Sequence, residues 1–152
     1  MKKILIFVLV LTIFTGCNNK VNDLDLDKIK NKLETLEYNE NKMFDCVYYD
    51  LDKLEFKYDI DINKIDKYLV CLHKNETSSN SYIIASYKNN KDELKSELDR
   101  LINYEKDSFS LGYYPKEEEK IENHYYKEDG KYLIYIISDN NELVYKAIQE
   151  KE

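Results

Sequence analysis

The sequence predicts an α+β fold: a two-layer sandwich in which a four-stranded antiparallel sheet carries helices packed on one face. Apolar residues recur at helical spacing in five segments, and four short β-rich runs fall into two pairs. The segments follow the order ααββααββα. The connection within each pair of strands is too short for a parallel crossover, so we expect two hairpins.

The first half should contain two helices and one hairpin. Residues 23–38 and 43–57 each carry one apolar stripe at helical spacing. The runs at 68–74 and 81–87 are rich in β-branched and aromatic residues and are separated by a polar loop, which is typical of two paired strands.

The second half repeats the pattern. Asn90 can cap a long helix, and Pro115 suits the first turn of a short one. Asp129-Gly130 lies between two β-rich runs, which is a strong hairpin signal. Asp139 is expected to cap the last helix, so the second hairpin is followed by one helix.

The first 17 residues have the layout of a secretory signal. Lys2 and Lys3 precede an apolar run at 4–14, and Thr15-Gly16-Cys17 places two small residues before a cysteine. The run is shorter than the ~20 residues of a transmembrane helix. An uncleaved anchor and a buried apolar helix are the alternatives.

Phe14-Thr15-Gly16-Cys17 resembles the lipobox of bacterial lipoprotein precursors. The resemblance implies a diacylglyceryl group on Cys17 and removal of residues 1–16. Residues 17–22 would then be a tether and residues 23–152 a single domain. Because two acyl chains hold a protein stably at a membrane, the expected location is the extracytoplasmic face of the cell membrane.

The charge of the processed chain limits its partners. It would have 136 residues, with 21 basic and 30 acidic side chains and a net charge of −9. An acidic surface argues against nucleic acid and against a basic patch on anionic lipid. The partners expected are the membrane, through the lipid on Cys17, and an envelope protein or small ligand.

Two cysteines remain beyond Cys17. Cys46 and Cys71 either form a disulfide, worth ~3 kcal/mol for a loop of about 25 residues, or are buried thiols. Cys71-x-His73 could supply two metal ligands, joined by His124 if the hairpins are neighbours. A strand cysteine and an exposed histidine are favoured instead, so neither metal nor cofactor is expected.

Two acidic stretches resemble calcium loops without satisfying the pattern. Asp23-x-Asp25-x-Asp27, with Glu34 at the twelfth position, has Lys28 where the loop needs Gly. Asp59-x-Asp61-x-Asn63 has Val70 at the twelfth position. A helix N-terminus and a turn are the favoured interpretations.

The candidate binding residues are one arginine and two tyrosine doublets. Arg100 is the only arginine, and its planar guanidinium suits an ion pair with Glu97 or a contact holding a loop, which we favour over ligand binding. Tyr113-Tyr114 and Tyr125-Tyr126 could form an aromatic binding patch. The alternative is a biased composition, in which Tyr takes the places of Phe.

Five landmarks follow one another in the second half of the chain: Ile83-Ile84, Leu98-Asp99-Arg100, Tyr114-Pro115, Gly130-Lys131-Tyr132 and Ile137-Ser138-Asp139. In this order they resemble domain-of-unknown-function family 4358, whose members are small lipoproteins of low-GC Gram-positive bacteria. Ala85-Ser86 departs from the acidic residue expected in the first strand pair. The resemblance assigns no catalytic residue.

The sequence also lacks a recognisable catalytic motif, such as a nucleophile in G-x-S-x-G. We therefore expect a non-enzymatic binding or interaction module and single out no catalytic residue. The alternatives are an envelope hydrolase that uses carboxylates and a structural subunit of an envelope complex. An occluded pocket with two close carboxylates would favour the hydrolase, and an exposed tyrosine patch would favour interaction.

Overall fold

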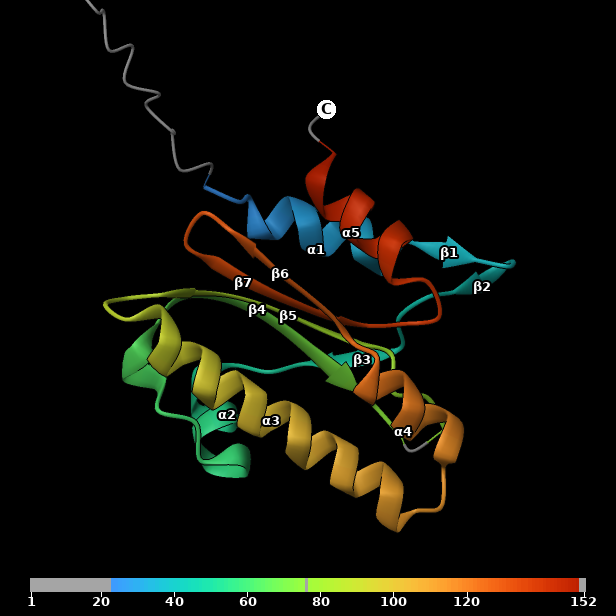
Figure 1. Cartoon of the computed structure of the whole chain (residues 1–152). Coiled ribbons are helices and arrows are strands. Elements are labelled where there is room, and N and C mark those ends of the chain that lie inside the picture. The colour runs from blue at the N-terminus through green and yellow to red at the C-terminus, as the bar shows by residue number, and fades with distance from the viewer. Residues whose placement is uncertain (1–22, 76, 151–152) are drawn as a thin grey trace, which may run out of the picture.

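The computed structural model describes residues 23–75 and 77–150, and Figure 1 shows how their elements are arranged. The helical elements are α1 (Leu26–Glu34), α2 (Leu51–Tyr58), the 3-10 helix η1 (Ile62–Lys64), α3 (Lys91–Leu111), α4 (Pro115–Glu122) and α5 (Asn141–Gln149). The strands are β1 (Glu37–Tyr38), β2 (Asn41–Lys42), β3 (Cys46–Tyr48), β4 (Ile65–His73), β5 (Ser81–Tyr87), β6 (Tyr125–Asp129) and β7 (Tyr132–Ile137). The α+β class is therefore confirmed.

The main sheet has five antiparallel strands in the order β3-β4-β5-β7-β6, whereas four were expected. The extra strand, β3, comes from residues 43–57, which were wrongly predicted to form one helix. Cys46 pairs with His73 and Tyr48 with Cys71, so this segment extends the sheet beyond β4. The helix begins only at α2, where the Asp50 carboxylate accepts a hydrogen bond from the Lys53 amide.

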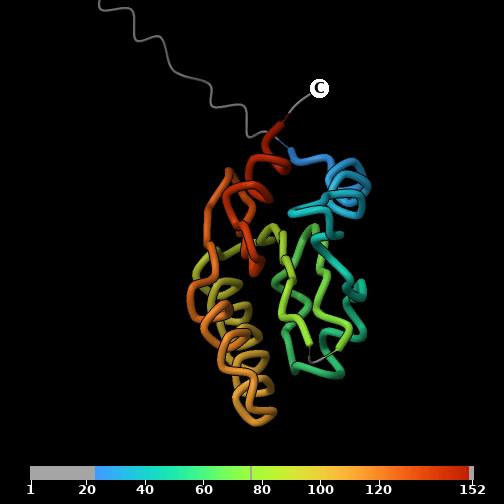
Figure 2. Tube along the Cα trace, turned by 90° about the vertical axis from the view of Figure 1, so that its right-hand side faces the viewer, coloured from blue at the N-terminus to red at the C-terminus, as the bar shows by residue number. Residues whose placement is uncertain are grey.

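Helices cover both faces of the sheet, so the prediction of helices on one face was wrong. Figures 1 and 2 show α1 and α5 on one side and α2, α3 and α4 on the other. The two apolar cores meet at the central strands: Ile83 and Leu133 belong to the core under α3, while Ile84 and Ile134 belong to the core under α1 and α5. All six residues of β7 are buried, as expected for a strand enclosed on both faces.

The segment between α1 and β3 also differs from the expectation. The first helix ends at Glu34 and not near Tyr38, because the chain turns into the ribbon β1-β2. Asn39 and Glu40, at the tip of this ribbon, both have positive φ angles, of 50° and 63°.

Two boundaries in the second half are shifted by one residue. The turn of the β6–β7 hairpin consists of Gly130 and Lys131, since Asp129 pairs with Tyr132, whereas Asp129-Gly130 was expected. Gly130 has a φ of 58°, a conformation that glycine adopts readily. The cap of α5 is Asn140, whose side chain accepts from the Leu143 amide, and not Asp139.

Candidate functional site

A pocket of about 330 Å³ opens where the end of α1, β2 and the start of β3 come together. Its lining combines two carboxylates, an amine, a hydroxyl, two aromatic rings and a sulfur: Glu34, Asp45, Lys42, Thr35, Phe44, Tyr48 and Cys46. Pockets that pair aromatic surface with a few polar groups are suited to binding small molecules or side chains. The pocket is partly open to solvent, and two carboxylates, those of Glu34 and Asp45, belong to its lining.

The aromatic wall of this pocket is anchored to the sheet. The hydroxyls of Tyr48 and Tyr82 lie 2.9 Å apart, and the Phe44 ring meets the Tyr82 ring edge-on at 4.8 Å. Burial is the main cause that raises the pKa of Tyr48, so its hydroxyl stays neutral at physiological pH. The Lys30 ammonium lies 4.5 Å from the centre of the Tyr48 ring, a cation–π contact.

A disulfide joins Cys46 to Cys71 beside this pocket. It connects β3 to β4, with the two Cα atoms 5.5 Å apart and a sequence separation of 25 residues. Cys71 is fully buried in the core under α1 and α5, whereas Cys46 lines the pocket. The bond therefore fixes the pocket wall to the sheet, and it leaves Cys71 without the free thiol that the metal-binding alternative with His73 requires.

His73 lies apart from Cys71 and enters a buried polar cluster under α3. Glu105 is only 2% exposed, and its Oε1 accepts a hydrogen bond of 2.8 Å from the Tyr58 hydroxyl. Its other oxygen, Oε2, forms an ion pair with His73 Nε2. His73 Nδ1 lies 3.0 Å from the Asn75 carbonyl oxygen, so a protonated ring can donate from both nitrogens.

The electrostatics of this cluster favour the charged imidazole. Burial acts to lower the pKa of His73, but the hydrogen bond to Glu105 and its negative charge outweigh burial and leave the pKa raised. Sequence reasoning did not single out Glu105. The available signal was its spacing, four residues after Leu101 and four before Phe109, which places a carboxylate within the apolar stripe of α3.

A second polar cluster ties α4 to the loops at one end of the sheet and was also not anticipated. The Lys120 ammonium lies 2.8 Å from the Asp139 carboxylate and 3.0 Å from the Glu117 carboxylate. It also donates a hydrogen bond of 3.0 Å to the amide oxygen of Asn80. The Ser79 hydroxyl donates to Glu117 at 2.8 Å. Burial acts to raise the pKa of Glu117, but the hydrogen bonds from Ser79 and Lys120 outweigh it and leave the pKa lowered, so Glu117 is a weak base and the arrangement is suited to holding loops together.

Arg100 lies away from the pocket and connects two helices. Its Nη2 is 2.6 Å from a Glu97 oxygen and also donates to the Asp59 backbone carbonyl, while Nη1 is 3.6 Å from the Asp59 carboxylate. Asp59 ends α2 in the left-handed conformation, with a φ of 54°. Arg100 therefore holds the turn that follows α2 against α3.

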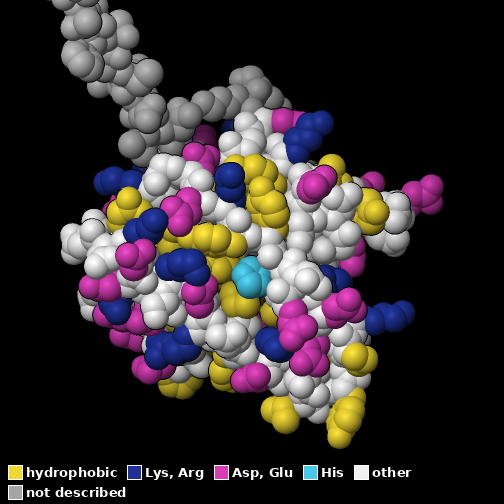
Figure 3. All heavy atoms as spheres, in the orientation of Figure 1, with side chains coloured by type: hydrophobic (Ala, Val, Ile, Leu, Met, Phe, Trp, Pro, Cys, Tyr) yellow, Lys and Arg dark blue, Asp and Glu magenta, His cyan; other side chains and the backbone are white. Residues whose placement is uncertain are grey.

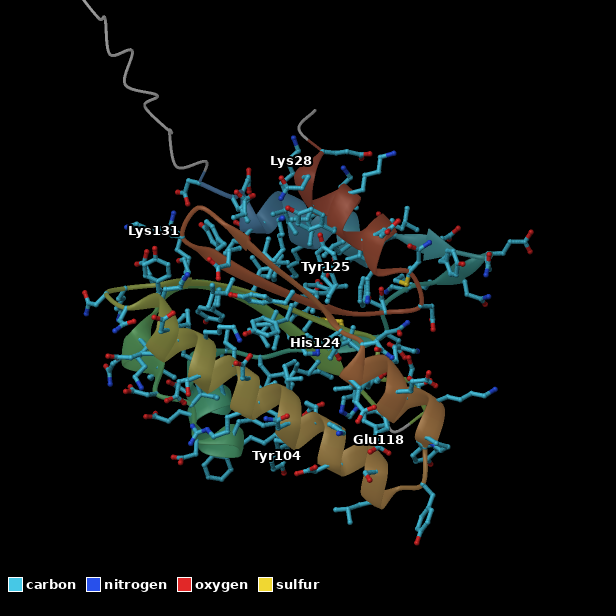
Figure 4. All side chains as sticks on the ribbon, in the orientation of Figure 1. Lys28, Tyr104, Glu118, His124, Tyr125 and Lys131 are labelled. Carbon is cyan, nitrogen blue, oxygen red and sulfur yellow. A yellow bond between two sulfur atoms is a disulfide. The ribbon has the colours of Figure 1, made fainter. Side chains whose placement is uncertain are left out.

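The four tyrosines of the doublets do not form one patch. Tyr125 and Tyr126 alternate across the sheet: Tyr125 packs 5.1 Å from Tyr145 of α5, and Tyr126 packs 4.8 Å from Tyr135. Both are half-buried, one against each of the two apolar cores. Figure 4 shows Tyr125 beneath α5, with His124 where α4 meets β6.

Tyr113 and Tyr114 lie in the turn between α3 and α4. Tyr114 packs edge-on against Phe109, with ring centres 6.2 Å apart, whereas Tyr113 is 91% exposed. The doublets therefore place only one fully exposed ring, that of Tyr113, at the surface.

Acidic residues of both calcium-loop look-alikes have structural roles in the fold. Asp25 caps α1 and Asp61 caps η1 through their side chains. Asp23 accepts a hydrogen bond of 2.6 Å from the Tyr132 hydroxyl and pairs with Lys67. Within residues 23–75 and 77–150, no group of three or more acidic, His or Cys side chains is arranged to hold a metal ion.

The comparisons with known proteins concern the segment that carries most of these contacts. Residues 45–138 match the family described as Domain of unknown function (DUF4358). The chain belongs to this family. No curated protein and no solved structure matches it.

The DUF4358 segment contains the five-stranded sheet and the layer formed by α2, α3 and α4. Helices α1 and α5, which cover the other face, lie outside it. The pocket crosses this boundary: Asp45, Cys46 and Tyr48 lie inside the segment, and Glu34 and Lys42 lie before it. The disulfide, the His73–Glu105 pair and Tyr113 all lie within the DUF4358 segment.

Proposed function

We propose that this DUF4358 protein is a lipid-anchored binding module at the extracytoplasmic face of the cell membrane. The observation that carries the proposal is the Cys46–Cys71 disulfide, because such bonds persist in oxidising compartments and are rare in the cytosol. The signal-like residues 1–16 and the anchoring Cys17 lie outside the described residues. No described helix is long and apolar enough to cross a bilayer.

The way the described chain begins supports a close attachment to the membrane. Asp23 follows Cys17 by six residues, which can span at most about 20 Å. Its carboxylate is held on the body of the domain by Tyr132 and Lys67. A lipid on Cys17 would therefore keep this end of the domain near the bilayer.

Binding is also the chemistry to which the pocket is suited. Tyr48, which is partly exposed, offers aromatic surface, and Lys42 and the carboxylates of Glu34 and Asp45 offer charges for orientation. Glu105, which pairs with His73, is buried under α3 and lies apart from this pocket. These features favour a binding module over the hydrolase.

Acylation of Cys17 is the first test. The full chain and a Cys17→Ser variant are expressed in a Gram-positive bacterium with an alkyne-labelled fatty acid, and cells are fractionated. The wild type should carry the label and stay with the membrane, whereas Cys17→Ser should be unlabelled and leave it. A control with Cys46→Ser and Cys71→Ser together should retain the label. Wild-type protein that keeps Met1 and stays in the cytosol would refute the proposal.

A further inference from the structure

The turn between α3 and α4 presents two large apolar side chains to solvent. Leu111 is 82% exposed and Tyr113 is 91% exposed. Figure 3 shows hydrophobic side chains projecting from the lower edge of the molecule, where α3 meets α4 in Figure 1. Burial of such side chains against a partner would be favourable, so their exposure marks a candidate interaction site.

This turn is a complete Schellman motif with one unusual residue. The Tyr114 amide donates to the Phe109 carbonyl at 3.1 Å and the Tyr113 amide to that of Ser110 at 3.2 Å. The apolar contact of the motif is also present, between the rings of Tyr114 and Phe109. The left-handed position, usually glycine, is occupied by Tyr113, with a φ of 62°.

The glycine lies one residue earlier and has a different role. Gly112 has a φ of −79°, which any residue can adopt. A Cβ atom there would come within 2.8 Å of the Tyr114 ring, so glycine at this position makes room for the packing of Tyr114. The backbone conformation that favours glycine is thus imposed on an exposed tyrosine, which gains no burial in return.

The position of the turn points to what it meets. Figures 1 and 2, which differ by a quarter turn, both place it at the opposite end of the domain from residue 23. A chain anchored through Cys17 would therefore hold Leu111 and Tyr113 away from its own bilayer. This orientation favours a partner above the membrane.

The charge around the turn selects among partners. Five acidic side chains lie near it, against three lysines: Asp107, Glu117, Glu118, Glu119 and Glu122, with Lys106, Lys116 and Lys120. Figure 4 shows Glu118 on α4 near the turn. A net acidic border disfavours both a second copy of this acidic chain and an anionic membrane, and it is complementary to basic side chains.

We propose that Leu111 and Tyr113 dock into an apolar pocket, bordered by Lys or Arg, on another protein of the cell envelope. This inference rests on the proposed anchoring, which sets the direction in which the turn points. Tyrosine is among the residues that most often dominate binding at protein interfaces. The Schellman motif presents it in a fixed geometry, so little order has to be imposed on binding.

Photo-crosslinking in intact cells tests the proposal. The full chain carries p-benzoylphenylalanine in place of Tyr113, and the matched control carries it in place of Phe56, which is 94% exposed on α2. We expect one discrete protein adduct from position 113 and none from position 56. Leu111→Ser should lower the adduct yield about tenfold, and Glu118→Lys with Glu119→Lys should also lower it. The crosslinked partner peptide should lie beside Lys or Arg residues.

The other outcomes overturn the proposal in distinguishable ways. A phospholipid adduct would make the turn a membrane contact, and an adduct to a second copy would make it a self-association surface. No adduct from protein that is lipid-labelled and membrane-bound would refute the docking site alone. Unlabelled wild-type protein in the cytosol would refute the anchoring and, with it, the docking site.

Discussion

Glu105 and His73 form a buried ion pair between α3 and the end of β4. The pair lies beside the core under α3, where the His73 ring packs 4.6 Å from that of Phe109, and the Tyr58 hydroxyl donates to the other carboxylate oxygen. A buried charge is costly unless it is paired and hydrogen-bonded, so the three side chains are energetically dependent on one another.

The pair predicts how stability depends on pH. The pKa of His73 is raised in the folded protein, because the hydrogen bond and charge of Glu105 outweigh burial. The native state therefore binds the proton more tightly than the unfolded chain. The contribution of His73 is fully present below its unfolded pKa of about 6.5 and is lost as pH rises through the folded pKa. Urea unfolding from acidic to alkaline pH should show the free-energy difference between wild type and His73→Gln shrinking with rising pH.

A Glu105→Gln variant is the matched control for this pH series. The amide can still accept the Tyr58 hydrogen bond, but the charge that raises the pKa of His73 is gone. Burial should then dominate, and the histidine contribution should increase with rising pH. A wild-type difference that is flat or grows with pH would show that the ion pair does not carry the effect.

The disulfide predicts a measurable loss of stability on its removal. Cys46→Ala with Cys71→Ala opens a loop with a sequence separation of 25 residues. The chain-entropy estimate for a loop of this length is about 3 kcal/mol, so the urea midpoint should fall accordingly. A thiol reductant should lower the midpoint of the wild type toward that of the double variant. A reductant effect of equal size on the double variant would indicate another cause.

Substitution of Arg100 should lower the free energy of unfolding less than loss of the disulfide does. In Arg100→Lys the charge is kept, but an ammonium cannot reach Glu97 and Asp59 with a planar fork as the guanidinium does. Because the site is partly exposed, we expect a loss of only about 0.5 to 1 kcal/mol in the free energy of unfolding. Lys95→Arg, which leaves this contact untouched, is the control. Identical melting curves for wild type and Arg100→Lys would reject the role of Arg100 in holding the turn after α2.

Local signals in the sequence were sufficient for much of the second half of the fold. The apolar stripe and the Asn90 cap predicted α3, and Pro115 predicted the start of α4. These features depend on neighbours along the chain, so they can be read from the spacing of residues. The family was likewise recognised from ordered landmarks, and the match over residues 45–138 confirms it.

The predictions that were wrong concern elements that depend on contacts between distant segments. Val47 and Leu51 fit a helical stripe, but Cys46–Tyr48 pairs with β4, more than 20 residues away, and the pairing overrides the local pattern. The second helical layer was missed for the same reason. The uninterrupted apolar run of β7, residues 132–137, was the available sign that both sheet faces are covered.

The candidate site likewise contains residues that could be named from the sequence and residues that only the packing of distant segments makes distinctive. The two cysteines and the exposed Tyr113 were named from residue type alone. Glu105 was missed because acidity is common in this chain, and only the packing of Tyr58 and His73 around it makes it distinctive. The pocket joins side chains from α1, β2 and β3, and β3 was not expected to be a strand.

Tyr113 predicts opposite changes in stability and in binding. Tyr113→Gly removes a side chain that is almost fully exposed and relieves the unfavourable left-handed conformation, so the free energy of unfolding should rise by up to about 1 kcal/mol. Tyr113→Ala is the matched control, because it also removes the ring but keeps the backbone penalty, and it should not stabilise. Both variants should lose binding of the crosslinked partner, measured with the purified full chain. Loss of binding in the more stable Gly variant would separate docking from folding, whereas a less stable Gly variant would show that the tyrosine contributes to the fold.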